Sequence, residues 1–284
     1  MKPKVIPTHE FKAEAKLPKF EYLAWRKNVS KYDVSLPHRH NYYEVLVFTK
    51  GGGKHEIDFE AHKIKSNSIH FVAANQVHVV KRLPGSSGYS FLFAAEFTDS
   101  NFNLSELAFY KPENTRILNL TKHDFEEVVN LLAEVQNNFM ADNKARREEI
   151  KYLFQAVLLK LQRLYLLQGN AKQILPIKNK QALQLQALIE EHYKQHWRAS
   201  EYASAMRTTS IQLNAISKQY FGKSTEAVIQ ERLLLEIKRA LVYGTKSIKE
   251  ICFDLNFEDP TYFIRFFKKH TGTTPLEYRK SVHE

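Results

Sequence analysis

The chain has 284 residues, 43% of them hydrophobic and 12% aromatic, which suits two folded domains and excludes a disordered protein. Its 42 Lys and Arg outnumber its 31 Asp and Glu, and the net charge of +11 favours a polyanionic partner such as nucleic acid or an anionic membrane surface. Cys252 is the only cysteine, so disulfides within the chain and thiolate zinc sites are excluded, and a buried, inert thiol is expected.

The cellular compartment is predicted from the lack of a membrane-spanning segment and of a signal peptide. No stretch approaches the ~18 consecutive apolar residues of a membrane-spanning helix. The first twenty residues, MKPKVIPTHEFKAEAKLPKF, have no apolar run of the kind found in signal peptides. We therefore expect a soluble cytoplasmic protein that makes no contact with a membrane.

Residues 30–97 predict short strands. Tyr43, Val45 and Val47 alternate with other residues in a period of two, and further apolar runs follow at 68–72, 77–80 and 89–97. Ser-Asn and Pro-Gly-Ser-Ser-Gly breaks separate these runs. The spacing indicates a small antiparallel barrel or sandwich. The triple glycine at 51–53 predicts a hairpin loop, because no phosphate-binding Lys-Ser/Thr follows it.

The same region carries a spaced group of possible ligands. "LPHRHNYYEVLVFTKGGG" places His38, His40 and Glu44 close together, and His78 in "NQVHVV" offers a fourth side chain. Imidazoles with a carboxylate form a chemically sound set for a divalent metal. A small-molecule pocket that uses the same polar groups is the other interpretation.

Two amphipathic helices are predicted after residue 120. The first is marked by Thr121 and Asp124 and has apolar residues at helical spacing up to Phe139; the second runs over 150–165. They either cover the barrel or pair with a second copy of the chain. Gly, Asn and Pro break the pattern after them and predict a linker over 169–179.

From residue 180 onward the pattern is helical and contains an internal repeat. When Gly222 is aligned with Gly272, Leu213 matches Phe263 and Lys218 matches Lys268. Each copy reads as a helix, a short turn, a second helix and a glycine stop, which is the helix-turn-helix plan. The net charge is shared by both halves of the chain, so DNA binding is inferred from this pattern and not from charge.

Start and stop signals support the repeat. Ser247 with Glu250 forms a capping box, and Asp259-Pro260 is an N-cap followed by proline at the first helical position. Left-handed C-caps are expected at the glycines. These glycines are Gly222, Gly244 and Gly272. Residues 225–243 predict a linking helix of about 28 Å, suited to holding two recognition helices about one DNA turn (~34 Å) apart.

The last recognition helix has two distinct stripes. Its expected buried face consists of Phe263, Phe266, Phe267 and His270. The remaining positions include Arg265, which has the geometry for a bidentate contact with guanine, and lysines better suited to phosphates. The aromatic stripe is predicted to hold the helix in place, and the basic stripe to contact DNA.

The last hundred residues resemble the AraC/XylS family of bacterial transcription regulators. The resemblance rests on "ERLLLEIKRALVYGTKSIKEICFDLNFEDPTYFIRFFKKHTGTTPLEYRKS". It implies a mixed two-domain fold, with an all-β cupin-like barrel and two following amphipathic helices at 1–168. A linker at 169–179 and an all-α DNA-binding domain with two helix-turn-helix motifs at 180–284 would follow.

The resemblance also implies which residues face DNA. They are the exposed positions of the first recognition helix (Ile211, Gln212, Asn214, Ala215, Lys218, Gln219) and of the second (Thr261, Tyr262, Ile264, Arg265, Lys268, Lys269). The first helix departs from the family pattern: Ala215 stands where Arg is frequent, and Ser217 replaces the usual core Phe. We therefore expect Gln212 and Asn214 to read bases there.

For the N-terminal domain the resemblance implies an effector pocket. Sensor domains of this family are similar to cupins, and His38, His40, Glu44 and His78 would line the pocket. His38, His40 and Glu44 match the first cupin motif, but the second motif is degraded: "KSNSIHFVAANQVH" lacks the glycines and proline of metal-binding cupins. A pocket without metal or other cofactor is therefore expected. The helices within 121–168 would form the surface of a homodimer. Contact with RNA polymerase is typical of the family.

The resulting hypothesis is an effector-controlled, dimeric, sequence-specific regulator of transcription that binds double-stranded DNA. No catalytic constellation is visible, so an enzyme is not expected. The alternative from another class is a cupin metalloenzyme that carries a DNA-tethering domain. A non-specific nucleic-acid packaging protein is weaker, because the two recognition faces differ.

Overall fold

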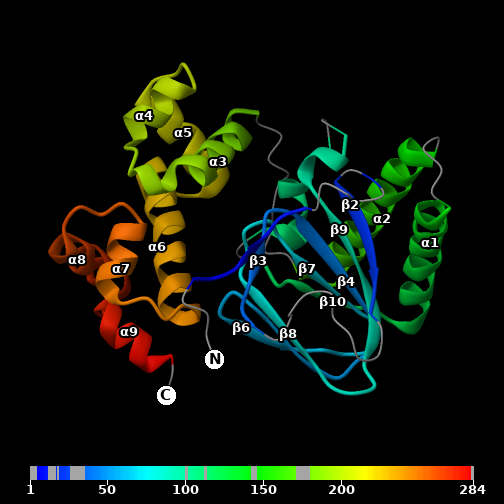
Figure 1. Cartoon of the computed structure of the whole chain (residues 1–284). Helices are drawn as coiled ribbons and strands as arrows, with labels where there is room; N and C mark the ends of the chain where they lie inside the picture. The colour runs from blue at the N-terminus through cyan, green and yellow to red at the C-terminus, as the bar shows by residue number, and fades with distance from the viewer. Residues whose placement is uncertain are drawn as a thin grey trace. The chain divides into compact units, whose positions relative to one another are not determined.

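The chain forms two compact units in the computed structural model, which describes residues 5–11, 17, 19–25, 36–99, 102–111, 114–141, 146–170 and 180–282 (Figure 1). One unit comprises Pro7–Ile174, and the other comprises Leu175–Glu284 with Met1–Ile6. The predicted linker at 169–179 lies outside the described residues from position 171 onward. No helix within the described ranges has the length and apolar character needed to cross a membrane.

Three sheets form the strand-rich part of the first unit. A five-stranded sheet has the order β10-β7-β4-β9-β2, a three-stranded sheet has the order β6-β5-β8, and β1 pairs with β3. The strands are β1 (Thr8–His9), β2 (Phe20–Ala24), β3 (Arg39–His40), β4 (Tyr43–Lys50), β5 (Gly53–Ile57), β6 (Glu60–Lys63), β7 (Ser68–Val72), β8 (His78–Arg82), β9 (Ser87–Phe93) and β10 (Ile117–Asn119). The pairing within the two larger sheets is antiparallel throughout, as the short, regularly spaced strands predicted.

The five-stranded sheet is buried on both faces, and the period of two decides which side chain lies where. On β4, Leu46 and Phe48 pack with Ile57 and Val80 of the smaller sheet. Val45 and Val47 point to the opposite face and lie in the larger core formed with the helices. Glu44 shares the parity of Leu46, so the alternation places it on the face toward the smaller sheet.

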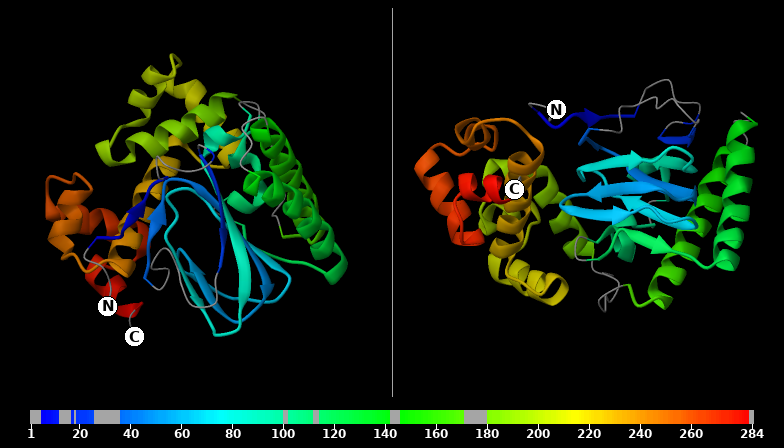
Figure 2. Two further views of the ribbon diagram at one scale, coloured as in Figure 1. Left: turned by 45° about the vertical axis from the view of Figure 1, so that its right-hand side comes forward. Right: turned by 90° about the horizontal axis from the view of Figure 1, so that it is seen from below.

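Two helices cover the outer face of the five-stranded sheet. They are α1 (Lys122–Met140) and α2 (Arg147–Leu167), which lie side by side (Figure 2). The predicted start of α1 is confirmed, because the Thr121 hydroxyl accepts a hydrogen bond from the Asp124 N–H at 3.1 Å. The short helices η1 (Ala95–Phe97), η2 (Leu104–Glu106) and η3 (Ala108–Tyr110) add to the same core.

The triple glycine does not form the predicted hairpin. Because β4 and β5 belong to different sheets, the glycines carry the chain from one sheet to the other. Gly52 and Gly53 have φ of 140° and 103°, and a Cβ on Gly53 would lie 2.0 Å from the Lys81 carbonyl oxygen. The glycines therefore serve a close approach between segments, which a local turn pattern does not distinguish from a hairpin.

The second unit is helical within the described residues. Its elements are α3 (Lys180–His192), η5 (Tyr193–Gln195), α4 (Ala199–Ala205), α5 (Ser210–Phe221), α6 (Thr225–Tyr243), α7 (Ile248–Asp254), α8 (Pro260–Thr271) and α9 (Pro275–Ser281). Two hydrophobic clusters divide it: one gathers α3, α4, α5 and the start of α6, and the other gathers the rest of α6 with α7 and α8. The two predicted helix-turn-helix motifs are α4–α5 and α7–α8, joined by α6.

The predicted helix signals hold with one exception. The capping box of Ser247 and Glu250 is present, and Gly222 and Gly272 have φ of 69° and 81° as left-handed C-caps. The expectation for Gly244 is wrong, because its φ of −98° and ψ of 167° are extended. From Gly244 the chain runs almost directly to the next N-cap, Ser247, which leaves no room for a reversing turn.

Candidate DNA-binding face and effector site

Helix α8 presents a basic face on a firmly packed support. Its N-cap Asp259 accepts hydrogen bonds from the N–H groups of Thr261 and Tyr262, each at 2.9 Å. These bonds hold the pKa of the Asp259 carboxyl below its usual value. Three Phe side chains of the helix, at 263, 266 and 267, are buried in the core. The cap and the aromatic stripe together fix the position of the opposite face.

All six residues predicted to face DNA on α8 are exposed. They are Thr261, Tyr262, Ile264, Arg265, Lys268 and Lys269. Three of them carry a positive charge, and 54% of the Tyr262 surface is accessible. His270, expected in the buried face, is half-buried beside the Phe266 ring, with ring centroids 4.6 Å apart.

Helix α5 presents a more neutral face. Five of its six predicted residues are exposed: Ile211, Gln212, Ala215, Lys218 and Gln219. Asn214 is the exception, because it is half-buried and its Oδ1 accepts the N–H of Thr225 at the start of α6, at 3.2 Å. The Gln212 Oε1 also accepts from the Thr208 hydroxyl at 2.8 Å. Both amides predicted to read bases are thus engaged within the domain.

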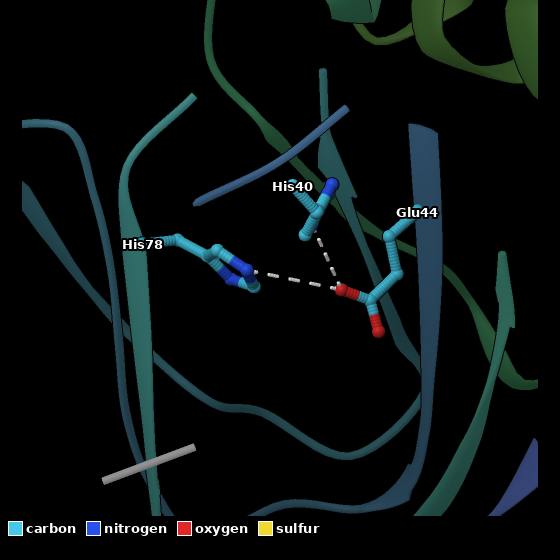
Figure 3. A group of neighbouring side chains, drawn as sticks. All are labelled: His40, Glu44 and His78. Atoms are coloured by element: carbon cyan, nitrogen blue, oxygen red, sulfur yellow. Dashed lines mark ion pairs between the residues drawn. The ribbon is translucent and has the colours of Figure 1, made fainter. Parts of the chain in front are cut away.

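A second polar site lies inside the strand-rich unit. His40 of β3, Glu44 of β4 and His78 of β8 point toward one another, with ligand atoms that all lie within 4.8 Å (Figure 3). The Glu44 Oε2 is 3.5 Å from the His40 Nε2 and 3.9 Å from the His78 Nε2. All three residues are buried.

His38, the fourth predicted residue of this site, stands beside the group. Its backbone pairs with that of His78 in an isolated bridge, and the two ring centroids are 4.3 Å apart. Its Nδ1 donates to the Leu36 carbonyl at 3.0 Å. The structure therefore brings three of the four predicted side chains together and leaves His38 at their edge.

Two further histidines belong to the same buried layer and were missed from the sequence. His55 of β5 and His70 of β7 are fully buried, and their Nδ1 atoms are 3.0 Å apart. The His55 Nε2 is 3.1 Å from the His78 Nδ1. Burial lowers the pKa of His55 well below its usual value and that of His70 to about 3. The sequence could have indicated their burial, because His55 and His70 each lie two residues from a core residue, Ile57 and Val72, and so point to the same face of their strand.

Known proteins resemble both units. Residues 17–158, half of the chain, match the AraC-like ligand binding domain, and residues 202–281 match a helix-turn-helix domain. This chain belongs to the AraC family of transcription regulators. Among its relatives, the uncharacterized HTH-type transcriptional regulator YisR of Bacillus subtilis (strain 168) is 27% identical over 145 residues, 51% of this chain and 48% of that protein.

Other AraC-family relatives align over different lengths. The virulence regulon transcriptional activator VirF of Yersinia enterocolitica is 29% identical over 36% of this chain and 37% of its own. The chain thus spans about half or less of the length of these first relatives. The transcriptional activator RhaS of Pectobacterium atrosepticum is 23% identical over 85% of this chain and 86% of its own. The crystal structure of ToxT from Vibrio cholerae O395 is 20% identical with a TM-score of 0.41, covering 93% of this chain and 98% of that one.

Proposed function

We propose that this AraC-family chain regulates transcription by binding specific double-stranded DNA sequences. The observation that carries the proposal is the face of α8, where Arg265, Lys268 and Lys269 are exposed on a helix anchored by buried Phe residues. A rigid recognition helix with a guanidinium for base edges and ammonium groups for phosphates is the arrangement needed for a major groove. Helix α5 adds a second, less charged face through Ile211, Ala215, Lys218 and Gln219.

Base reading by α5 is proposed to differ from that of α8. Asn214 and Gln212 already make hydrogen bonds to the backbone and hydroxyl groups around them. A base contact by either amide has to share or replace these bonds. We therefore place sequence preference chiefly in α8 and assign to α5 apolar and phosphate contacts, such as Ile211 with a thymine methyl group.

The strand-rich unit is proposed to receive a small-molecule effector. His38, His40, Glu44 and His78 form a buried polar group between two sheets, in a domain that matches the AraC-like ligand binding domain. An effector controls DNA occupancy only if its affinity differs between two arrangements of the protein. Control by an effector requires this difference in affinity, and we propose that the effector contacts the buried polar group.

We further propose a homodimer that forms through α2. Tyr152, Leu159 and Leu166 are exposed apolar residues that recur every second turn, with Ala156 and Arg163 between them on the same stripe. The other face of α2 is already buried in the core of its unit. An apolar stripe with this spacing suits the seam between two helices. The proposal also includes a cytoplasmic location and contact with RNA polymerase, which are family expectations.

The relatives whose names state a role are transcription regulators, and this favours a regulator over a cupin metalloenzyme with a DNA tether. The test is selection of bound sequences from a random DNA pool by the full chain, followed by titration of the selected duplex against a scrambled one. A preference of ~10³-fold or more at physiological salt is expected. Equal affinity for the two duplexes would overturn sequence-specific binding.

A further inference from the structure

We infer that His40, Glu44 and His78 form a binding site for a divalent transition-metal cation. This departs from the metal-free pocket expected from the sequence, and it does not depend on DNA binding. The three side chains come from three strands, β3, β4 and β8, and all are buried. Bonds of 2.0–2.2 Å place neighbouring ligand atoms ~3 Å apart and opposite ones ~4 Å apart. The separations of 3.5 and 3.9 Å between Glu44 and the two imidazoles fall in that range, and all three ligand atoms lie within 4.8 Å of one another.

Hydrogen bonding selects the tautomer of a neutral His40 that leaves Nε2 with a lone pair. Its Nδ1 lies 2.6 Å from the Tyr42 carbonyl oxygen, which only accepts, so the ring proton of the neutral imidazole is on Nδ1. The His40 ring is also stacked on the Tyr42 ring, with centroids 4.1 Å apart and planes 5° apart. The ring is thus held in one orientation, with its Nε2 3.5 Å from the Glu44 Oε2. Such an outer contact is typical of metal-binding histidines.

A chain of hydrogen bonds reaches the same result for His78. The Ser68 hydroxyl donates to the Lys65 carbonyl at 2.7 Å and so accepts from the His70 Nε2 at 3.3 Å. The His70 Nδ1 then accepts from the His55 Nδ1–H, and the His55 Nε2 accepts from the His78 Nδ1–H. Each neutral ring carries one proton. The His78 Nε2 is therefore left with a lone pair, and it lies 3.9 Å from the Glu44 Oε2.

The site thus gathers lone pairs of electrons that no hydrogen-bond donor satisfies. Neither the His40 Nε2 nor the His78 Nε2 has a hydrogen-bond partner among the described residues, although both are buried. Burying unpaired acceptors beside a carboxylate costs free energy. A proton on His40 would form an ion pair with Glu44 but would leave the His78 acceptor unpaired. A cation bound by all three groups satisfies every one of them.

The ligand types indicate the class of ion. Two imidazoles and one carboxylate suit Fe²⁺, Mn²⁺, Co²⁺ or Zn²⁺, whereas Ca²⁺ and Mg²⁺ favour oxygen ligands alone. Three protein ligands leave open positions for water or for an oxygen atom of a small molecule. Glu44 supplies the negative charge, and the tautomers set by Tyr42 and His55 orient the imidazoles.

The test measures metal binding by the full chain, with any affinity tag removed and metal stripped by a chelator. Titration with Co²⁺ and Zn²⁺, followed by the Co²⁺ visible spectrum and by metal analysis after dialysis, is expected to show one bound ion per chain. His40→Ala, His78→Ala and the more conservative Glu44→Gln should each weaken binding by at least ~100-fold, beyond the 10–100-fold typical of outer contacts. His123→Ala, an exposed histidine of α1, is the control and should bind as the original chain does.

His55→Phe separates positioning from coordination. This variant keeps all three ligands but removes the acceptor of the His78 Nδ1–H, so metal affinity should fall ~10–100-fold with one ion still bound at saturation. Circular dichroism of each metal-free variant verifies that it is folded. Absence of stoichiometric binding by the original chain, or unchanged affinity in the folded His40→Ala and Glu44→Gln variants, would overturn the metal site.

Discussion

At the residue scale, position 265 carries the sharpest difference between the two recognition helices. Arg265 is exposed on α8, and the matching position of α5 is Ala215, which has no polar group. A guanidinium has the fork geometry for the O6 and N7 of guanine, whereas the ammonium of Lys268 acts as a point charge for phosphate. The two side chains are therefore expected to contribute to binding in different ways.

We expect Arg265→Ala to weaken binding of the selected DNA by about 1–3 kcal/mol and to relax the preference at one base pair. Lys268→Ala should weaken binding of the selected and scrambled duplexes alike. It should also reduce the slope of log K against log salt concentration by about 1. Salt titrations of both duplexes measure these effects. Lys122→Ala, on the exposed surface of α1, is the control. If Arg265→Ala weakened both duplexes equally, its assignment to base reading would be wrong.

His70 illustrates how burial converts a histidine into a pH-sensitive element of stability. Burial holds its pKa at about 3 in the folded chain, against 6.5 in an unfolded one. Between these values the unfolded state binds a proton that the folded state does not. The stability of the metal-free chain is therefore complete above pH 6.5 and is lost as the pH falls.

We expect this single residue to cost about 1.4 kcal/mol of unfolding free energy between pH 7.5 and 5.5. The original chain should lose that much more stability than a His70→Gln variant over the same interval. Urea denaturation with a chelator present, followed by Trp25 fluorescence in a Trp197→Phe background, isolates the strand-rich unit. Equal losses in the two proteins would show that His70 is not held neutral.

At the element scale, α5 and α8 repeat the same plan with unequal cores. Phe267 of α8 is fully buried among aromatic and aliphatic side chains. The matching residue of α5, Ser217, is equally buried, and its hydroxyl has no hydrogen-bond partner among the described residues. A buried hydroxyl without a partner costs free energy and fills less volume than a phenyl ring. The core beneath α5 is therefore expected to hold its helix less firmly than the core beneath α8 does.

We expect Ser217→Ala to stabilise the helical unit by about 1 kcal/mol, because it removes the unpaired hydroxyl and improves helix propensity. Thermal unfolding followed by Trp197 fluorescence in a Trp25→Phe background measures the change near the site. Ser204→Ala, at an exposed position of α4, is the matched control and should change stability by less than about 0.5 kcal/mol. A destabilised Ser217→Ala variant would mean that the hydroxyl has a partner after all.

At the scale of the whole molecule, the proposed dimer links sensing to DNA binding. Leu159 lies in the middle of the exposed apolar stripe of α2, between Tyr152 and Leu166. A second copy packed on this stripe would place two helical units on one DNA molecule. Two linked sites raise the affinity for a paired operator through effective concentration.

We expect Leu159→Glu to convert the dimer to a monomer and to weaken binding of a selected paired site by at least ~10²-fold, with little loss on a single half-site. Sedimentation and DNA titration measure the two effects. Leu83→Glu, at an exposed leucine beyond the end of β8, is the matched control. A Leu159→Glu variant that remains dimeric would exclude α2 as the interface.

Many helix starts in both units could be predicted from local signals. Caps such as Thr121, Ser247 and Asp259 act over three or four residues, and the structure confirms them. The paired motifs followed from a repeat that is visible when Gly222 is aligned with Gly272. The misses share a cause: the glycines at 51–53 and Gly244 are shaped by where the chain goes next, which no local pattern encodes.

The sequence alone determined the short strands followed by helices and the two helix-turn-helix motifs, because strand and helix periodicity and caps are short-range properties. The resemblance to a family added the cupin-like fold and the residues expected to face DNA. Only the tertiary structure decided which histidines meet. It joins His40, Glu44 and His78 from three strands, leaves His38 aside and adds His55 and His70 behind them. Strand order and register set these contacts, and both depend on pairings between distant segments, which the spacing of residues along the chain does not specify.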